Sequence, residues 1–293
     1  MTYNYQARLC LDAGSICGEG PVWDHRSKRL WWVDITRGWF HYLDPKSGDT
    51  GHFETPPLVS GIVLAADGGL IVATSAGLHR MDPETGHLRF LHDPEPDVPG
   101  NRLNDIKVDP RGRLWVGTMS EGARAPSGAL YRYDPEGCRR MADGMTVTNG
   151  MGWSPDESVF YLIDSKPAEI LAFDADPVTG TIARRRRFLR FDDGKPDGMC
   201  VDADGTLWVA ICDAGYVAGI SPEGRIVARI EVPVQRITSC AFGDDDLRTL
   251  YITSGLFGLD QGQMAAYPTS GALFSVRLPV PGVAQVPAGP LGV

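Results

Sequence analysis

The chain has 293 residues, of which 43% are hydrophobic and 22% charged. A chain of this length and composition can bury a large core, which excludes a disordered protein. Its formal net charge of −9 disfavours nucleic acid as a partner, because the phosphate backbone would be repelled. The 35 glycines and 22 prolines are scattered along the chain, which predicts many turns.

The N-terminal segment and the cysteines indicate where the protein works. Residues 1–6 lack the basic start and apolar core of a secretory signal, and no window approaches the ~18 apolar residues of a membrane span. The six cysteines are dispersed, and none forms a Cys-x-x-Cys pair. We therefore expect a cytoplasmic protein with reduced thiols and no membrane partner.

Six similar segments follow one another along the chain. Each has a turn rich in Asp, Ser, Gly or Pro and then a large apolar residue that opens a strand, as in Asp67-Gly68-Gly69-Leu70. These apolar residues are Leu30, Leu70, Leu114, Phe160, Leu207 and Leu250, spaced 40, 44, 46, 47 and 43 residues apart. A period of about 40–50 residues with several short strands is typical of a β-propeller blade.

A second turn, such as Asp44-Pro45-Lys46-Ser47-Gly48, follows in most segments and is typical of a hairpin. Sustained helical periodicity is absent, so helix content should be very low. The sixth segment ends soon after residues 272–276, and we expect residues 7–11 to supply its outer strand and close the ring. The sequence thus predicts an all-β, six-bladed β-propeller with four antiparallel strands per blade, forming one domain over residues 1–293.

Four consecutive arginines at 184–187 contrast with the acidic net charge. They lie between Ile182 and Phe188 in a predicted strand. Two interpretations are open: a solvated edge strand that resists the addition of further strands, and a phosphate-binding patch. The edge strand is favoured, because charged residues commonly protect exposed sheet edges.

One polar residue precedes each of the six apolar positions by 10 or 11 residues. In chain order these are Glu19, Ser60, Asn104, Asn149, Asp197 and Ser239. Nearly equal offsets place them at one height around the propeller axis, where the loops that enter the innermost strands converge. Two carboxylates and two carboxamides at that height form an oxygen-rich set that suits a hard divalent cation.

A purely structural interpretation competes with the metal site. Asn149-Gly150 and Asp197-Gly198 are common turn pairs, and each taken alone is explained by a turn. Glu19 differs, because glutamate is a poor turn residue, and the joint match at equal offsets favours a metal site. The chain has no His-Glu-x-x-His, Gly-x-Ser-x-Gly or Gly-rich phosphate motif, which disfavours a histidine-type zinc hydrolase, a serine hydrolase and a nucleotide-binding enzyme.

At these segments the sequence resembles the SMP-30/gluconolactonase/luciferin-regenerating family, which includes regucalcin. The matching stretches are residues 18–23 (GEGPVW), 101–109 (NRLNDIKVD), 148–154 (TNGMGWS) and 196–202 (PDGMCVD). The resemblance implies a six-bladed propeller that binds one divalent metal on its axis and hydrolyses a sugar lactone. It also implies metal ligands, namely Glu19, Asn149 and Asp197, and substrate-binding residues, namely Arg102, Asn104 and Glu121.

The same resemblance implies a mechanism. The ion would polarise the lactone carbonyl, and Asp197 would act as the general base that takes a proton from the attacking water. The ion's identity stays open among Ca²⁺, Mg²⁺, Mn²⁺, Zn²⁺ and Fe²⁺. Two other functions also stay open: a metal-dependent esterase or organophosphatase on the same propeller, and a non-catalytic scaffold.

Overall fold

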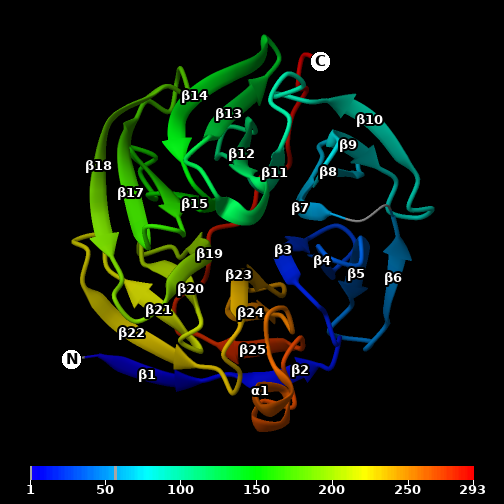
Figure 1. Cartoon of the computed structure of the whole chain (residues 1–293), viewed down its shortest axis with the longest axis vertical. Helices are drawn as coiled ribbons and strands as arrows, with labels where there is room; N and C mark the ends of the chain where they lie inside the picture. Colours follow the sequence, from blue (N-terminus) through cyan, green and yellow to red (C-terminus); the bar gives the residue numbers. More distant parts are fainter. Residues whose placement is uncertain (1, 56–57) are drawn as a thin grey trace.

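The structure is a computed structural model that describes residues 2–55 and 58–293, and it confirms the six-bladed β-propeller (Figure 1). Each blade is a sheet whose consecutive strands run antiparallel from the hub outward. The first three blades comprise β3 (Gly18–Asp24), β4 (Arg29–Asp34), β5 (Trp39–Leu43) and β6 (Thr50–Glu54); β7 (Val59–Leu64), β8 (Leu70–Thr74), β9 (Gly77–Met81) and β10 (Leu88–His92); and β11 (Asn101–Val108), β12 (Leu114–Ser120), β13 (Gly128–Asp134) and β14 (Gly137–Met145).

The last three blades follow the same order. They comprise β15 (Thr148–Trp153), β16 (Val159–Asp164), β17 (Glu169–Ala175) and β18 (Ile182–Arg190); β19 (Lys195–Val201), β20 (Leu207–Cys212), β21 (Tyr216–Ile220) and β22 (Ile226–Glu231); and β23 (Ile237–Gly243), β24 (Thr249–Ser254), β25 (Leu273–Arg277) and β2 (Arg8–Leu11). Each innermost strand contacts the innermost strand of the next blade, and β23 contacts β3, so the ring is closed.

The N-terminal segment closes the ring as expected and also adds a strand to the neighbouring blade. Strand β2 pairs antiparallel with β25 as the outer strand of blade 6, although it begins at Arg8 and not at residue 7. The preceding strand β1 (Tyr3–Gln6), which the sequence analysis did not anticipate, pairs parallel with β22 as a fifth strand of blade 5. Ala7 lies between them and donates its N–H to the Glu231 carbonyl, so one short segment joins two blades.

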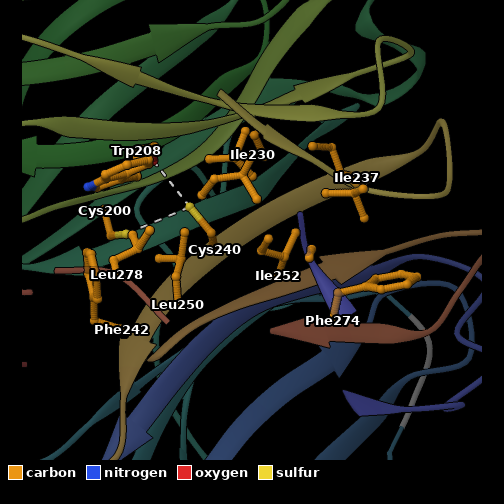
Figure 2. Packing of buried hydrophobic residues seen from close by; sticks show 14 of the residues in the cluster. Cys200, Trp208, Ile230, Ile237, Cys240, Phe242, Leu250, Ile252, Phe274 and Leu278 are labelled. Atoms are coloured by element: carbon orange, nitrogen blue, oxygen red, sulfur yellow. Dashed lines mark hydrogen bonds between the residues drawn. The ribbon is translucent and has the colours of Figure 1, made fainter. Parts of the chain in front are cut away.

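The six apolar positions that set the period lie near the start of the second strand of each blade, and each side chain is at most 1% exposed. Both faces of a blade pack against neighbouring blades, so these strands are buried along their whole length. Figure 2 shows this packing between blades 5 and 6, where Trp208 and Ile230 face Leu250 and Phe274 across the interface. Burial of this apolar surface holds neighbouring blades together.

Helix content is very low, as predicted. The only helices in the described part of the chain are α1 (Gln261–Ala266) and a 3₁₀ turn, Glu121–Ala123. Residues 184–187 lie on β18, the exposed outer strand of blade 4, where Arg187 pairs with Glu169 at 3.1 Å. All six cysteines are free thiols. Within residues 2–55 and 58–293, no helix is long and apolar enough to span a membrane.

The C-terminal segment after β25 crosses the ends of the innermost strands. Figure 1 shows it, in red, passing behind the ring. Backbone hydrogen bonds tie Gly282 to Leu247, Gly289 to Gly112, and Ala288 to Leu64. These partners lie where the first strand of a blade turns into the second, which is the end of the ring opposite the entry of the innermost strands.

One buried histidine makes the stability of the fold sensitive to acid. His41 is 6% exposed and stacks on Trp32 with ring centroids 4.9 Å apart, and burial lowers its pKa from 6.5 to about 4. The unfolded chain therefore binds a proton that the folded chain excludes, so stability should fall as the pH drops from about 6.5 to 4, by an amount of the order of 3 kcal/mol.

Replacing His41 with phenylalanine should keep the stack on Trp32 and remove this acid-linked loss. We expect thermal melting of His41→Phe to depend less on pH between 6.5 and 4 than that of the parent protein. His87→Phe, at an exposed position, is the matched control and should retain the parent's dependence. Equal pH dependence in His41→Phe and the parent would contradict the assignment.

Candidate active site

A β-bulge interrupts each innermost strand near its start. The register with the second strand shifts between Glu19 and Val22 in β3, Val59 and Gly61 in β7, Leu103 and Ile106 in β11, Asn149 and Met151 in β15, Pro196 and Met199 in β19, and Ile237 and Ser239 in β23. A bulge breaks the alternation of side chains and re-aims those within it. The six polar positions thus coincide with the bulges, inside the strands and not in the loops that enter them, which corrects the expectation.

A chain of hydrogen bonds joins three of the expected residues across two blades. Arg102 Nη1 donates to Asn104 Oδ1 at 2.8 Å, and Asn104 Nδ2 donates to Asn149 Oδ1 at 2.8 Å. The chain continues from Asn149 Nδ2 to Ser165 Oγ at 2.8 Å, and from Ser165 Oγ to the Pro196 carbonyl at 2.6 Å. It therefore reaches the residue next to Asp197 and fixes the orientation of both carboxamides.

Two carboxylates, Glu19 and Asp197, lie half-buried at the hub. Burial raises the pKa of Glu19 well above its usual range, and the negative charge of Asp197 raises it further. Burial likewise raises the pKa of Asp197, together with the charge of Asp105. Among the described residues neither Glu19 nor Asp197 forms an ion pair with Lys, Arg or His, although a hydrogen bond from Asn149 and the charge of Lys195 oppose the rise in the pKa of Asp197.

Two residues beside this pair, Asp105 and Cys17, were not among the predicted site residues. Asp105 carries a third half-buried carboxylate, whose charge raises the pKa of both Glu19 and Asp197. Cys17 is also close, since the charges of Glu19 and Asp197 add to burial in raising the pKa of its thiol. Asp105 directly follows Asn104 in the sequence, and this adjacency could have pointed to it. No sequence pattern pointed to Cys17.

The remaining predicted residues form the rim and the wall of the candidate active site. Glu121 is exposed at the start of the 3₁₀ turn, and its backbone N–H donates to the Gly100 carbonyl at 2.7 Å. Burial lowers the pKa of Arg102, and the charges of Cys17, Glu121 and Glu19 oppose that effect. Ser60 and Ser239 are buried, and the Ser60 hydroxyl has no hydrogen-bond partner within the described ranges.

Close approach of β15 and β19 at the hub depends on a glycine. A Cβ atom at Gly150 would lie 2.7 Å from both the Asp197 carbonyl oxygen and the Met199 nitrogen, which real Cβ atoms essentially never do. Gly150→Ala should therefore push β15 away from β19, separate Asn149 from Asp197, and cost about 1–3 kcal/mol of stability.

This substitution should also lower turnover of the substrate at least about tenfold, because a small displacement of positioned groups has large kinetic effects. Thermal melting and steady-state kinetics measure the two effects. Gly262→Ala is the control, since in helix α1 its Cβ would meet only Asp260 Oδ1, at 3.3 Å. Parent-like turnover in Gly150→Ala would show that the spacing of these strands does not matter.

The side-chain oxygens of Glu19, Asn149 and Asp197 are of the type that a hard divalent cation prefers. Glu19 and Asp197 offer carboxylate oxygens, and Asn149 Oδ1 accepts one hydrogen bond, which leaves a second lone pair. Two carboxylates without an ion-pair partner among the described residues also provide the charge that a divalent ion neutralises. No group of three His, Cys, Asp or Glu side chains suited to a metal occurs in the described residues, so a metal site at this pair would need a ligand of another type, such as the Asn149 carboxamide.

Comparison with known proteins identifies the family. A model described as the SMP-30/Gluconolactonase/LRE-like region matches residues 17–255. The chain belongs to this family. It is 37% identical to 6-deoxy-6-sulfogluconolactonase of Pseudomonas putida over 92% of this chain and 94% of the relative, and 34% identical to regucalcin of Xenopus laevis over 91% and 93%.

Among SMP-30/Gluconolactonase/LRE-like structures, a regucalcin from Agrobacterium tumefaciens described as a calcium-binding protein superposes with a TM-score of 0.93. The two chains are 29% identical, and the match covers 98% of each. The family match spans all six innermost strands, from Cys17 beside Glu19 to Gly255 after β24. These two ends of the match form a β-bridge with each other, where blade 6 meets blade 1.

Proposed function

We propose that the protein is a divalent-metal-dependent lactonase that hydrolyses a sugar lactone to the aldonic acid. The observation that carries the proposal is the pair of half-buried hub carboxylates, Glu19 and Asp197, which form no ion pair with a described residue and lie next to the hydrogen-bonded chain from Arg102 to Asn149. A relative that is a sulfogluconolactonase and a structural neighbour described as calcium-binding support the same reaction class and a metal.

Three residues would hold the ion: Glu19, Asn149 and Asp197. A bound divalent cation supplies Lewis-acid polarisation of the substrate carbonyl. Asn149 is held for this role from both sides, because Asn104 donates to its oxygen while its own amide donates to Ser165. As a neutral ligand it leaves the site with more positive charge than a third carboxylate would.

Asp197 would take the proton from the attacking water. Burial and the charge of Asp105 raise the pKa of this carboxyl in the metal-free protein, whereas a bound cation would lower it, so Asp197 would hold the ion with one oxygen and accept the proton on the other. It lies in a bulge of β19, the innermost strand of blade 5, and Gly198 follows it. A lactone is an activated ester, so one positioned base and a polarised carbonyl meet the chemical demand.

Arg102 and Asn104 would bind the hydroxyl groups of the sugar. Arg102 Nη1 is engaged by Leu103 and Asn104, while its Nε and Nη2 groups donate to no described residue and are free for a substrate. Asn104 uses both amide hydrogens within the protein, so only its oxygen has capacity left. Glu121 would contact the substrate from the rim of the site.

Two further proposals concern the protein as a whole. The closed ring supports one domain over residues 1–293, and the free cysteines support a reducing compartment such as the cytoplasm.

Acid release from a panel of fresh aldonolactones tests the function. The panel should include pentono- and hexonolactones and a lactone with a sulfonate at C6, and each should be assayed with chelator and after each of the five ions is restored. Aryl esters and a phosphotriester complete the panel. Turnover of sugar lactones only with an ion present supports the proposal; preference for aryl or phosphate esters, or metal-independent turnover, rejects it.

A further inference from the structure

A cavity lies at the opposite end of the innermost strands from the candidate active site. It has a volume of about 120 Å³ and is lined by β11, β15, β19 and β23 together with the C-terminal residues 283–286. An apolar cavity of roughly 150 Å³ holds a benzene molecule, so this space suits a body of about one ring. The C-terminal segment supplies one wall, and the candidate active site uses none of the lining residues.

The wall of this cavity is mostly apolar. Met151, Cys200 and Phe242 line it and are each at most 7% exposed. Two valines of the C-terminal segment, Val283 and Val286, line its mouth and are 47% and 37% exposed. Figure 2 shows Cys200 and Phe242 close together on neighbouring strands. Apolar side chains at an open mouth favour a ligand with an apolar body.

Among the lining residues, all of them within the described ranges, one charged side chain has no ion-pair partner, and its charge is positive. Lys107 lines the cavity, is half-buried, and forms no ion pair or side-chain hydrogen bond with any described residue. Its ammonium lies near Cys200, because its charge opposes the rise in the pKa of that thiol caused by burial and by Cys240. The cavity therefore contains an amine with no partner.

Asp109 also lines the cavity, but its carboxylate already has ion-pair and hydrogen-bond partners within the protein. Its Oδ2 accepts hydrogen bonds from Arg113 Nε at 2.6 Å and from Trp115 Nε1 at 3.0 Å. Its Oδ1 accepts from the backbone nitrogens of Arg111 and Arg113. A ligand in the cavity would thus meet the field of Lys107 and not that of a free carboxylate.

We propose that this cavity binds a small monoanionic molecule with an apolar body the size of one ring, whose carboxylate pairs with Lys107. A single ammonium among apolar side chains, with no arginine in the wall, matches one carboxylate better than a phosphate, which arginine forks bind bidentately. This site goes beyond the proposed lactonase function and does not depend on it.

The position of the cavity connects it to the hub. Lys107, Met151 and Cys200 lie two or three residues after Asp105, Asn149 and Asp197 on the same three strands.

Calorimetric titration with benzoate tests the proposal, with neutral benzamide as the matched ligand. Benzoate should bind the full-length protein at least about tenfold more tightly than benzamide. Lys107→Gln should lose that difference, while Lys46→Gln, at an exposed turn, should retain it. Ala284→Trp fills the cavity from its exposed rim without changing charge or the buried core, and should also abolish binding.

Each other outcome rejects the site. Absent binding to the parent protein, equal binding of benzoate and benzamide, or unchanged binding to Ala284→Trp would each overturn the proposal. The Ala284→Trp arm keeps this test valid even if Lys107→Gln does not fold. Asp197→Asn should bind benzoate as the parent does, so a failure of the lactonase proposal and a failure of this site give different results.

Discussion

Replacing Asp197 with asparagine should leave the propeller folded and reduce lactone turnover by about 10²–10⁴-fold, the usual contribution of a positioned general base. Asparagine has nearly the same shape, so the bulge in β19 and the contact of Gly198 with blade 6 should persist. It has no basic oxygen at neutral pH, so it cannot take the proton from water. Steady-state acid release from the preferred lactone measures the effect.

The same substitution should stabilise the metal-free fold. The pKa of Asp197 is raised in the folded chain, so stability associated with this group is present at low pH and is lost as the pH rises through the raised folded value. At neutral pH Asp197 therefore destabilises the metal-free fold, and asparagine removes this cost. Thermal melting in chelator should show a higher midpoint for Asp197→Asn than for the parent at neutral pH, and no difference in strong acid.

Asp192→Asn is the matched control for both effects. Asp192 is exposed and lies just before β19, so its loss removes one negative charge near the same strand without touching the hub. We expect parent-like turnover and melting. If Asp197→Asn also kept most of the parent's turnover, Asp197 would not be the base, and the proposed mechanism would be wrong.

Removal of divalent metal should abolish turnover, and restoring the ion should recover it and raise the melting midpoint. The fold holds Glu19 and Asp197 near each other without a compensating cation from the protein, so an ion that binds there stabilises the folded state by its binding free energy. Because the pKa values of both carboxyls are raised, protons compete with the ion, and its affinity should fall as the solution is acidified.

Glu19→Gln tests which residues hold the ion. Loss of one of two charged ligands should raise the metal concentration needed for half-maximal activity at least about tenfold. Turnover at saturating metal should fall much less than in Asp197→Asn, since Glu19 takes no part in proton transfer. Glu84→Gln, at an exposed turn, is the control. An unchanged metal requirement in Glu19→Gln would place the ion elsewhere.

The sequence by itself was sufficient to determine the repeat, and through it the architecture. Leu30, Leu114 and Leu250 each lie first or second in the second strand of a blade, and the turns around them form where Asp, Pro and Gly fall. These features are local: a strand needs a few apolar residues, and a hairpin needs a few turn residues. A constant period then places equivalent residues at equivalent heights, which is why Glu19, Asn149 and Asp197 were predicted to meet at the hub.

Only the tertiary structure decided what depends on contacts between distant segments. The bulges that turn the polar residues inward arise from strand pairing across each blade, and the carboxamide chain joins Asn104 to Asn149, 45 residues away. Three other features also leave no periodic pattern in the sequence. They are the pairing of β1 with β22, the third carboxylate at Asp105, and the cavity under the C-terminal segment. Each depends on which surfaces meet when the ring closes, and a local pattern of residues carries no record of its distant neighbours.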